Sequence, residues 1–225
     1  MTVERREISG YDRVRFRGPG VLKIVQDGTE GVTIHAPAWM MEKIEARVDE
    51  GRLILGYGKS RVVSLHAHKE VVSYTLHVKE LGSLDCQGIA TRVLVPDLDT
   101  DQLKVRLSGQ GHLIFERLTA DRLDARVSGT GVIQAKGDVE QQHIRIDGAG
   151  HYRASALVSD FAVVGIAGAG KADLSVSDRL DVTINGAGHV TYDGYPEVSR
   201  IISGIGKLSR RRRREKVPMS GEDHG

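Results

Sequence analysis

The chain has 225 residues, of which 4% are aromatic and 27 are glycine, and its formal net charge is +2 at pH 7. This composition excludes a chain-wide polyelectrolyte and a core filled mainly by aromatic side chains, and it suits narrow stacked sheets filled by Val, Ile, Leu and Ala. Cys86 is the single cysteine, which excludes an intramolecular disulfide.

The N-terminal residues show no targeting signal. Residues 1–7 lack the apolar h-region of a secretory signal peptide. No apolar run reaches the roughly 18 residues of a membrane span. We therefore expect a chain without a transmembrane segment, and the residues alone leave its location open, with the cytoplasm as one alternative.

Residues 1–87 are rich in strand patterns but follow no fixed period. The best strand candidates alternate apolar and polar residues, and they are 14–17, 22–25, 32–34, 53–55 and 74–78. The stretch 38–47 predicts one or two helical turns. A stack of repeats needs an atypical end to protect its exposed edge. We therefore interpret residues 1–87 as an irregular β-rich cap with early rungs.

From residue 88 onward a Gly-x-Gly tripeptide recurs every 18–21 residues, beginning with the degenerate copy Gly88-Ile89-Ala90. A fixed period of this size indicates one structural unit stacked many times. Glycine suits a sharp corner because it has no Cβ and accepts a positive φ. We therefore predict structural turns at Gly109, Gly111, Gly129, Gly131, Gly148, Gly150, Gly168, Gly170, Gly186, Gly188, Gly204 and Gly206.

The residues before each turn alternate as they do in strands with one buried face. Two residues before the first glycine stand Leu107, Val127, Ile146, Ile166, Ile184 and Ile202. Four residues before it stand Val105, Ala125, Ile144, Val164 and Val182, and Arg200 then breaks the series. A second short strand follows each turn, and polar stretches such as 116–122 are predicted to turn the chain back.

These patterns predict an all-β fold, namely a parallel β-helix or solenoid with two main sheets and rungs of about 18–21 residues. Each rung would advance by about 4.8 Å. No interval between repeats holds a long amphipathic helix, which argues against a doubly wound α/β fold. We expect one solenoid domain over residues 1–208, regular from 88 to 208, and a basic, disordered tail over 209–225.

The pattern apolar-x-apolar-[Ser/Asp/Asn]-Gly-x-Gly resembles that of the auto-transporter adhesin head GIN domain family. Segments 7–14 and 44–55 are similar to that family's first strand and middle segment, so the resemblance covers about residues 4–208. It implies a two-sheet β-helix, a role in adhesion at the bacterial surface, a secreted or cell-envelope location and no assigned catalytic residues. Members often carry an acidic residue just after the second glycine, where this chain has His112, Val132, His151, Lys171, His189 and Lys207.

Two basic features are candidate contacts for an anionic partner. The first is the set His112, His151, Lys171, His189 and Lys207, which gains charge as histidine protonates below about pH 6.5. The second is the run Arg210, Arg211, Arg212, Arg213 and Arg214. The alternative for both is a solvated surface without a partner. No reading helix or aromatic platform accompanies them, so specific recognition of nucleic acid is not expected.

The sequence predicts no cofactor and no metal. Equivalent atoms of histidines on alternate rungs would lie roughly 10 Å apart, which is too far for one metal ion. His66, His68 and His77 give only a weak spacing signal. The Gly-x-Gly copies lack the third glycine of a dinucleotide-binding motif, and Gly58-Lys59-Ser60 lacks the earlier glycine of a phosphate loop.

The signals for catalysis are equally weak. Asp97, Asp99 and Asp101 alternate and could share a face, but Pro96 beside them favours a loop. Hydrolysis of glycosides needs paired carboxylates facing one cleft. Cys86 lies beside a turn with no evident base, so packing is the favoured interpretation.

The sequence therefore favours a non-enzymatic β-solenoid with an adhesin-like, surface-binding role. It would act through multivalent contacts with surface glycans or an anionic envelope polymer. The first alternative is an intracellular scaffold that self-associates through its open end as a homo-oligomer. The second is a carbohydrate-active enzyme, because β-helices host pectin-degrading enzymes.

Overall fold

The computed structural model describes residues 1–57 and 71–211, and most of them lie in strands. The first elements are β1 (Thr2–Arg6), β2 (Arg13–Arg17), β3 (Gly20–Gln26), β4 (Gly31–Ala36), α1 (Ala38–Met41), β5 (Ile44–Asp49), β6 (Arg52–Tyr57) and β7 (Ser73–Val78). The repeats form β8 (Ser83–Val95), β9 (Leu98–Gly129), β10 (Val132–Gly148), β11 (His151–Gly168), β12 (Lys171–Gly186), β13 (His189–Asp193), β14 (Glu197–Gly204) and β15 (Lys207–Arg210). The predicted all-β class is confirmed.

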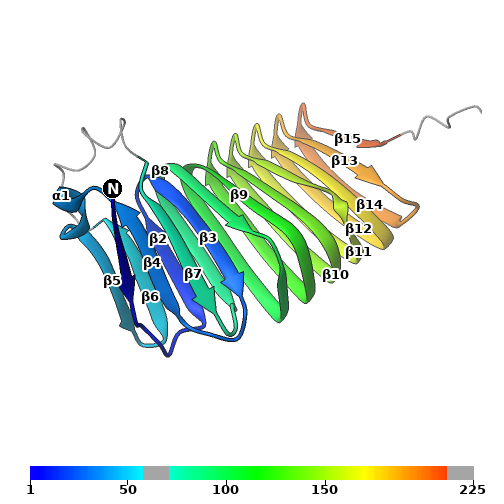
Figure 1. The fold of residues 1–225 in the computed structure, drawn as a ribbon. Coiled ribbons are helices and arrows are strands. Elements are labelled where there is room, and N and C mark those ends of the chain that lie inside the picture. Colours follow the sequence, from blue (N-terminus) through cyan, green and yellow to red (C-terminus); the bar gives the residue numbers. More distant parts are fainter. Residues whose placement is uncertain (58–70, 212–225) are drawn as a thin grey trace, which may run out of the picture.

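The strands stack as the rungs of a solenoid, with the N-terminal strands at one end and β13 to β15 at the other (Figure 1). Each rung crosses two sheets that meet at the Gly-x-Gly turn. The pre-turn sheet holds the segments that end at the first glycine, and the post-turn sheet holds those that follow the second. Neighbouring rungs pair in parallel, so Ile146 lies opposite Val127 on one side and Ile166 on the other. The predicted two-sheet parallel solenoid is confirmed.

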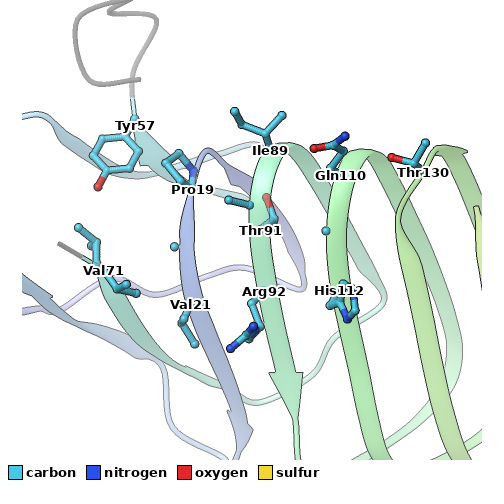
Figure 2. Close-up of a pocket in the computed structure, with 14 residues that line it drawn as sticks. Pro19, Val21, Tyr57, Val71, Ile89, Thr91, Arg92, Gln110, His112 and Thr130 are labelled. Atoms are coloured by element: carbon cyan, nitrogen blue, oxygen red, sulfur yellow. The ribbon is translucent and has the colours of Figure 1, made fainter. Parts of the chain in front are cut away.

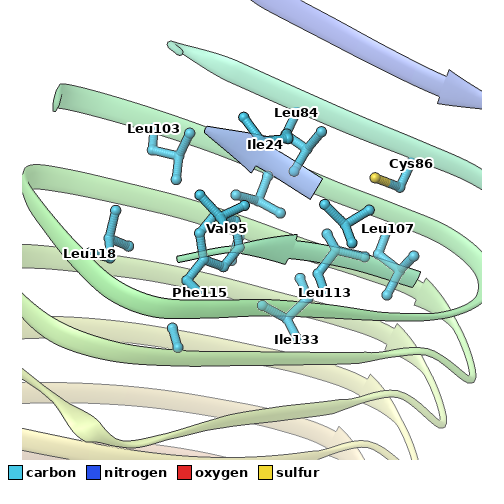
Figure 3. Close-up of a cluster of buried hydrophobic side chains, with 14 of the residues drawn as sticks. Ile24, Leu84, Cys86, Val95, Leu103, Leu107, Leu113, Phe115, Leu118 and Ile133 are labelled. Atoms are coloured by element: carbon cyan, nitrogen blue, oxygen red, sulfur yellow. The ribbon is translucent and has the colours of Figure 1, made fainter. Parts of the chain in front are cut away.

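Apolar columns fill the space between the two sheets. The inward residues Val127, Ile146 and Ile166 of the pre-turn sheet are buried. Inward residues of the post-turn sheet, such as Leu113 and Phe115, join the same core (Figure 3). Each inner rung is covered by a rung above and a rung below, so hydrophobic burial stabilises the rod along its length.

One polar network lies within this core. The hydroxyl of Tyr152 donates to Oε1 of Gln142 at 2.7 Å, and Nε2 of Gln142 donates to Oγ of Ser159 at 2.8 Å. The Ser159 hydroxyl in turn donates to the carbonyl of Ser175 at 3.2 Å. Buried polar groups need such partners, and this chain of bonds links β10, β11 and β12. Burial raises the pKa of the Tyr152 phenol far above its usual value.

The segments that return the chain to the next pre-turn strand are extended and paired. The stretch 116–122 returns the chain to the next pre-turn strand as predicted, but it does so as a paired part of β9 with Leu118 and Ala120 buried, and not as an unpaired polar turn. Differences in repeat length are absorbed after the Gly-x-Gly turn. Register shifts fall between Ala135 and Gly137 and between Ala154 and Val158. The last residues before each first glycine stay in unbroken register with the next rung.

The N-terminal part has a spatial order that differs from its chain order. The rung formed by β2 and β3 lies between the rung formed by β6 and β7 and the strand β8. Antiparallel strands β1, β4 and β5 complete this end. The strands predicted within residues 1–87 all form. The helix predicted over 38–47 is partly wrong, because α1 ends at Met41 and the chain enters β5, which pairs with β6.

The last described rung consists of β14 and β15. Val198 and Ile202 stand in its inward columns but are partly exposed, and Arg200 lies opposite Val182 in the same inward row. β15 runs to Arg210, and the amide of Arg211 donates to the carbonyl of Tyr192 at 2.7 Å. Regular pairing thus extends past residue 208, the expected end of the domain. Residues 212–225 of the expected tail lie outside the described residues.

Candidate functional site

The first glycine of each turn is required by backbone geometry. Gly109, Gly129, Gly148, Gly168, Gly186 and Gly204 all have positive φ. Gly148 has φ +127°, and an added Cβ would lie 2.8 Å from the carbonyl oxygen of Gly129 on the rung before. A side chain there would meet both strained torsions and a backbone atom that cannot move aside.

The second glycine is required by the core. The second glycines are Gly111, Gly131, Gly150, Gly170, Gly188 and Gly206, and none of them has a positive φ. A Cβ on Gly188 would lie 2.7 Å from Cγ2 of Ile166. The two glycines of each pair therefore act differently. The first sets the corner, and the second leaves room for an inward side chain of the rung before, except at Gly111, where an added Cβ would lie 2.8 Å from the carbonyl oxygen of Thr91.

The predicted His/Lys set forms one outward column on the post-turn sheet, which we call the His/Lys column. Its members His151, Lys171, His189 and Lys207 lie opposite one another on successive rungs. Val132 separates His151 from His112. Lys171 and Lys207 are exposed, as is His112, while His151 and His189 are partly covered.

Carboxylates neutralise part of the His/Lys column. Nε2 of His151 lies 2.7 Å from Oδ2 of Asp173. Arg211 pairs with Asp173 at 3.4 Å and with Asp193 at 3.2 Å, so the arginine run begins bound to the solenoid rather than free. The guanidinium of Arg210 lies 4.5 Å from the ring centroid of Tyr195. This surface is of mixed charge, and Arg212, Arg213 and Arg214 lie outside the described residues.

A second column, of arginines, follows the outward face of the pre-turn sheet. Arg106, Arg126 and Arg145, which we call the arginine column, each stand three residues before a first glycine, and Arg126 lies opposite Arg145. All three are exposed, and so is Lys104, two residues before Arg106. The next position is Gly165, opposite Arg145, where the column ends.

Carboxylates balance only part of the charge on the arginine column. Asp147 lies 2.7 Å from Arg126 and 3.1 Å from Arg145. Partial burial acts to raise the pKa of Asp147, but the hydrogen bond from Arg145 and the charge of Arg126 hold that pKa below its usual value. Among residues 1–57 and 71–211, no carboxylate oxygen comes within 4.0 Å, the limit for an ion pair, of a side-chain nitrogen of Lys104 or Arg106.

A groove of about 470 Å³, which we call the arginine groove, lies along this column. The ionisable groups that line it are Lys104, Arg106, Arg126, Arg145, Asp124 and His143. Four permanent cations line the groove with one carboxylate, Asp124, while Asp147 pairs with two of the cations, so the remaining net positive charge makes the groove attractive to anions. Val163 and Gly165 also line it, and the outward side chains of Val163 and Phe161 on β11 are 45% and 46% exposed.

Sequence reasoning did not single out the arginine column. The three arginines look like the ordinary polar positions of alternating strands. The signal that distinguishes them is their shared distance from the turn glycine in three consecutive repeats. Parallel stacking converts that shared distance into one line of charge.

A larger depression, of about 720 Å³, lies at the turn edge of the early rungs (Figure 2). Pro19, Ile89 and Gln110 are middle residues of successive turns along it, and His112 points from the adjoining strand. Its rim includes Tyr57 and Val71, which border residues 58–70. The phosphate-loop motif at 58–60, His66 and His68 fall in that segment, outside the described residues.

Asp99 and Asp101 lie in the strand β9, so the loop favoured by Pro96 holds only for Asp97, which precedes that strand. Asp97 pairs with Arg117 through Nε at 2.9 Å, and burial raises the pKa of the Cys86 thiol far above its usual value. His77 pairs with Asp27 at 2.7 Å. No group of three or more His, Cys, Asp or Glu residues is placed to hold a metal within the part of the chain that the structure describes. In that same part, no helix has the length and apolar character to cross a bilayer.

The fold and its corners define a parallel β-solenoid built on Gly-x-Gly turns. The sequence matches the family described as "Putative auto-transporter adhesin, head GIN domain" over residues 10–196, and the chain belongs to that family. The resemblance inferred from the repeats is thereby confirmed. No curated protein matches the sequence.

Several crystal structures share the fold. A "putative adhesin" from Bacteroides fragilis NCTC 9343 is 20% identical, with a TM-score of 0.86 over 93% of this chain and 96% of that one. A "putative lipid binding protein" from Parabacteroides distasonis ATCC 8503 is 19% identical, with a TM-score of 0.73 over 94% and 96%. A "putative adhesin" from Parabacteroides merdae ATCC 43184 is 18% identical, with a TM-score of 0.69 over 94% and 96%. At these identities the likeness establishes the fold alone.

Proposed function

We propose that the protein is a non-enzymatic, adhesin-like module that binds a cell surface through repeated contacts along its solenoid. The observation that carries this proposal is the alignment of outward side chains. Residues that stand the same number of positions before the turn glycine lie opposite each other on successive rungs, as Arg126 and Arg145 do. The family to which the chain belongs and two of its structural relatives are described as adhesins, which supports the same role.

A rigid ladder suits multivalent binding. Backbone hydrogen bonds fix each rung to the one before, as when the amide of Ala169 donates to the carbonyl of Gly148 at 2.9 Å. Outward groups then repeat every 4.8 Å or so. Once one contact forms, the next becomes intramolecular, so weak contacts add through effective concentration. A preorganised surface also loses little conformational entropy on binding.

The partner class that we infer is a surface glycan or another anionic envelope polymer. Cell fractionation with protease accessibility on intact cells tests the location, and sedimentation of the purified protein with envelope fragments tests the binding. We expect protease-sensitive protein at the envelope and co-sedimentation with the fragments. Protein that stays protected inside the cell and does not co-sediment would refute the proposal.

A second candidate function is self-association of the solenoid as a scaffold inside the cell. The observation that favours it is the last described rung, where Ile201 and Ile205 are 64% and 86% exposed and the outer edges of β14 and β15 pair with no further strand in the described residues. Light scattering across a concentration series tests this candidate. A mass that rises to a dimer supports it, and a constant monomer mass excludes it.

A further inference from the structure

We propose that the arginine groove binds an anionic polysaccharide, with the arginine column contacting carboxylates on successive sugars. This inference rests on the proposed surface-binding function and gives that function a site and a ligand class. The contacts would come from Arg106, Arg126 and Arg145, with Lys104 also lining the groove.

The charge of the groove is available to a ligand. Arg126 and Arg145 share the single carboxylate of Asp147, while Lys104 and Arg106 form no ion pair within the described residues. A guanidinium presents parallel N–H donors that match a carboxylate in bidentate geometry. The groove therefore holds more cationic donors than its own carboxylates occupy.

The shape of the groove favours a chain that runs along the solenoid axis. The arginines stand on successive rungs about 4.8 Å apart, and the column ends where Gly165 replaces an arginine. There the outward surface becomes apolar, with Val163 and Phe161 each nearly half exposed. A binding site with a few fixed polar groups beside an apolar surface suits a sugar ring, which has polar edges and C–H faces.

The charge density of the groove argues against nucleic acid. Duplex DNA carries one phosphate per about 3.4 Å of helix axis on each strand, which is a denser line of charge than one arginine per rung. Carboxylates interrupt the same face at Asp124 and Asp147, and they would repel a densely charged chain. Single-stranded nucleic acid is also held by rows of aromatic side chains, whereas Phe161 is a single exposed ring beside this groove.

The test measures the affinity of the full chain for oligogalacturonate, neutral dextran and single-stranded DNA at two salt concentrations. The variant R106Q/R126Q/R145Q removes the arginine column. The variant K23Q/K43Q/K136Q removes the same charge at exposed positions outside both basic columns. We expect oligogalacturonate binding that weakens with salt and falls about tenfold or more in the arginine variant, because charge-assisted hydrogen bonds are lost. The lysine variant should stay within about threefold of the wild type.

The variant R106K/R126K/R145K serves as a control for folding. It keeps the positive charge and removes the paired N–H donors of the guanidinium. It should bind with an affinity between those of the wild type and the glutamine variant. The inference is overturned if oligogalacturonate does not bind, if the arginine and lysine variants lose affinity equally, or if DNA binds more tightly. If R106Q/R126Q/R145Q still co-sediments with envelope fragments as the wild type does, the site assignment fails while the surface-binding function stands.

Discussion

Replacing either glycine of a turn should destabilise the fold, but for different physical reasons. Substitutions at Gly148 and Gly150 allow the two costs to be measured. Alanine at Gly148 would sit at φ +127° with its Cβ 2.8 Å from a backbone oxygen. Alanine at Gly150, where φ is not positive, would meet Cγ1 of Val127 most closely, with the carbonyl oxygen of Gly131 at 3.1 Å and Cβ of Val127 at 3.2 Å. A side chain can rotate or be removed, whereas the paired backbone of the preceding rung cannot.

The magnitudes follow from these contacts. A non-glycine residue held at an unfavourable positive φ costs about 1–3 kcal/mol, and overpacking against fixed atoms adds roughly 1–3 kcal/mol. Gly148→Ala should therefore destabilise the fold by about 3 kcal/mol or more. Gly150→Ala carries only the overpacking cost, and Val127→Ala should relieve the part of it that comes from Cγ1, with a coupling energy of about 1 kcal/mol in a double-mutant cycle.

Urea denaturation followed by circular dichroism gives the free energies. The fluorescence of Trp39, the single tryptophan, reports on α1 at the N-terminal end and shows whether unfolding is global. Val127→Ala should leave the cost of Gly148→Ala unchanged within about 0.5 kcal/mol. A cost below about 1 kcal/mol for Gly148→Ala, or equal rescue of both alanines, would refute the distinction between the two glycines.

Three further predictions concern the core, pH and the last rung. Tyr152→Phe should cost about 1–3 kcal/mol in urea denaturation, because Gln142 loses its buried donor; no change would mean that the network contributes nothing to stability. Hydrogen bonds from Thr29 help to lower the pKa of Asp27 from 3.8 to about 2. The stability that the ionised Asp27 carboxylate contributes is therefore present above pH 3.8 and is lost as pH falls toward 2. Thr29→Ala should raise that pKa in a carboxyl NMR titration, and an unchanged value would contradict the assignment. Arg200→Val should increase self-association in light scattering, because it removes a charge from the edge strand β14; an unchanged monomer would refute that role for Arg200.

The sequence was sufficient to predict the core of the repeats, because each inward position is covered by the same position on the next rung. An apolar residue is therefore required there in every repeat, as in the row from Val127 to Ile184, which is buried throughout. Arg200 could be recognised as the exception for the same reason. It stands in the last described rung, where no further rung covers the inward side.

The errors fall where structure depends on contacts distant in sequence. The return at 116–122 was predicted from its polar outward side chains, but its pairing with β10 through the return could not be predicted locally. Nothing local indicates that the β2–β3 rung inserts between β6–β7 and β8. The contact of His151 with Asp173 could not be predicted because Asp173 lies on the neighbouring rung, 22 residues away, and only the stacking brings the two together.

The position of the register shifts explains why a binding column should lie close to the turns. Repeats of unequal length can stack only if some segment absorbs the difference, and here the shifts fall after the Gly-x-Gly turn. From Gln141 to Gly148, and in the matching segment from Phe161 to Gly168, pairing is continuous. A side chain three or five residues before the first glycine therefore keeps its alignment whatever the length of the repeat. Outward residues beyond the shifts lose this constant spacing. A periodic ligand would thus be recognised on the pre-turn sheet, where the arginine column stands.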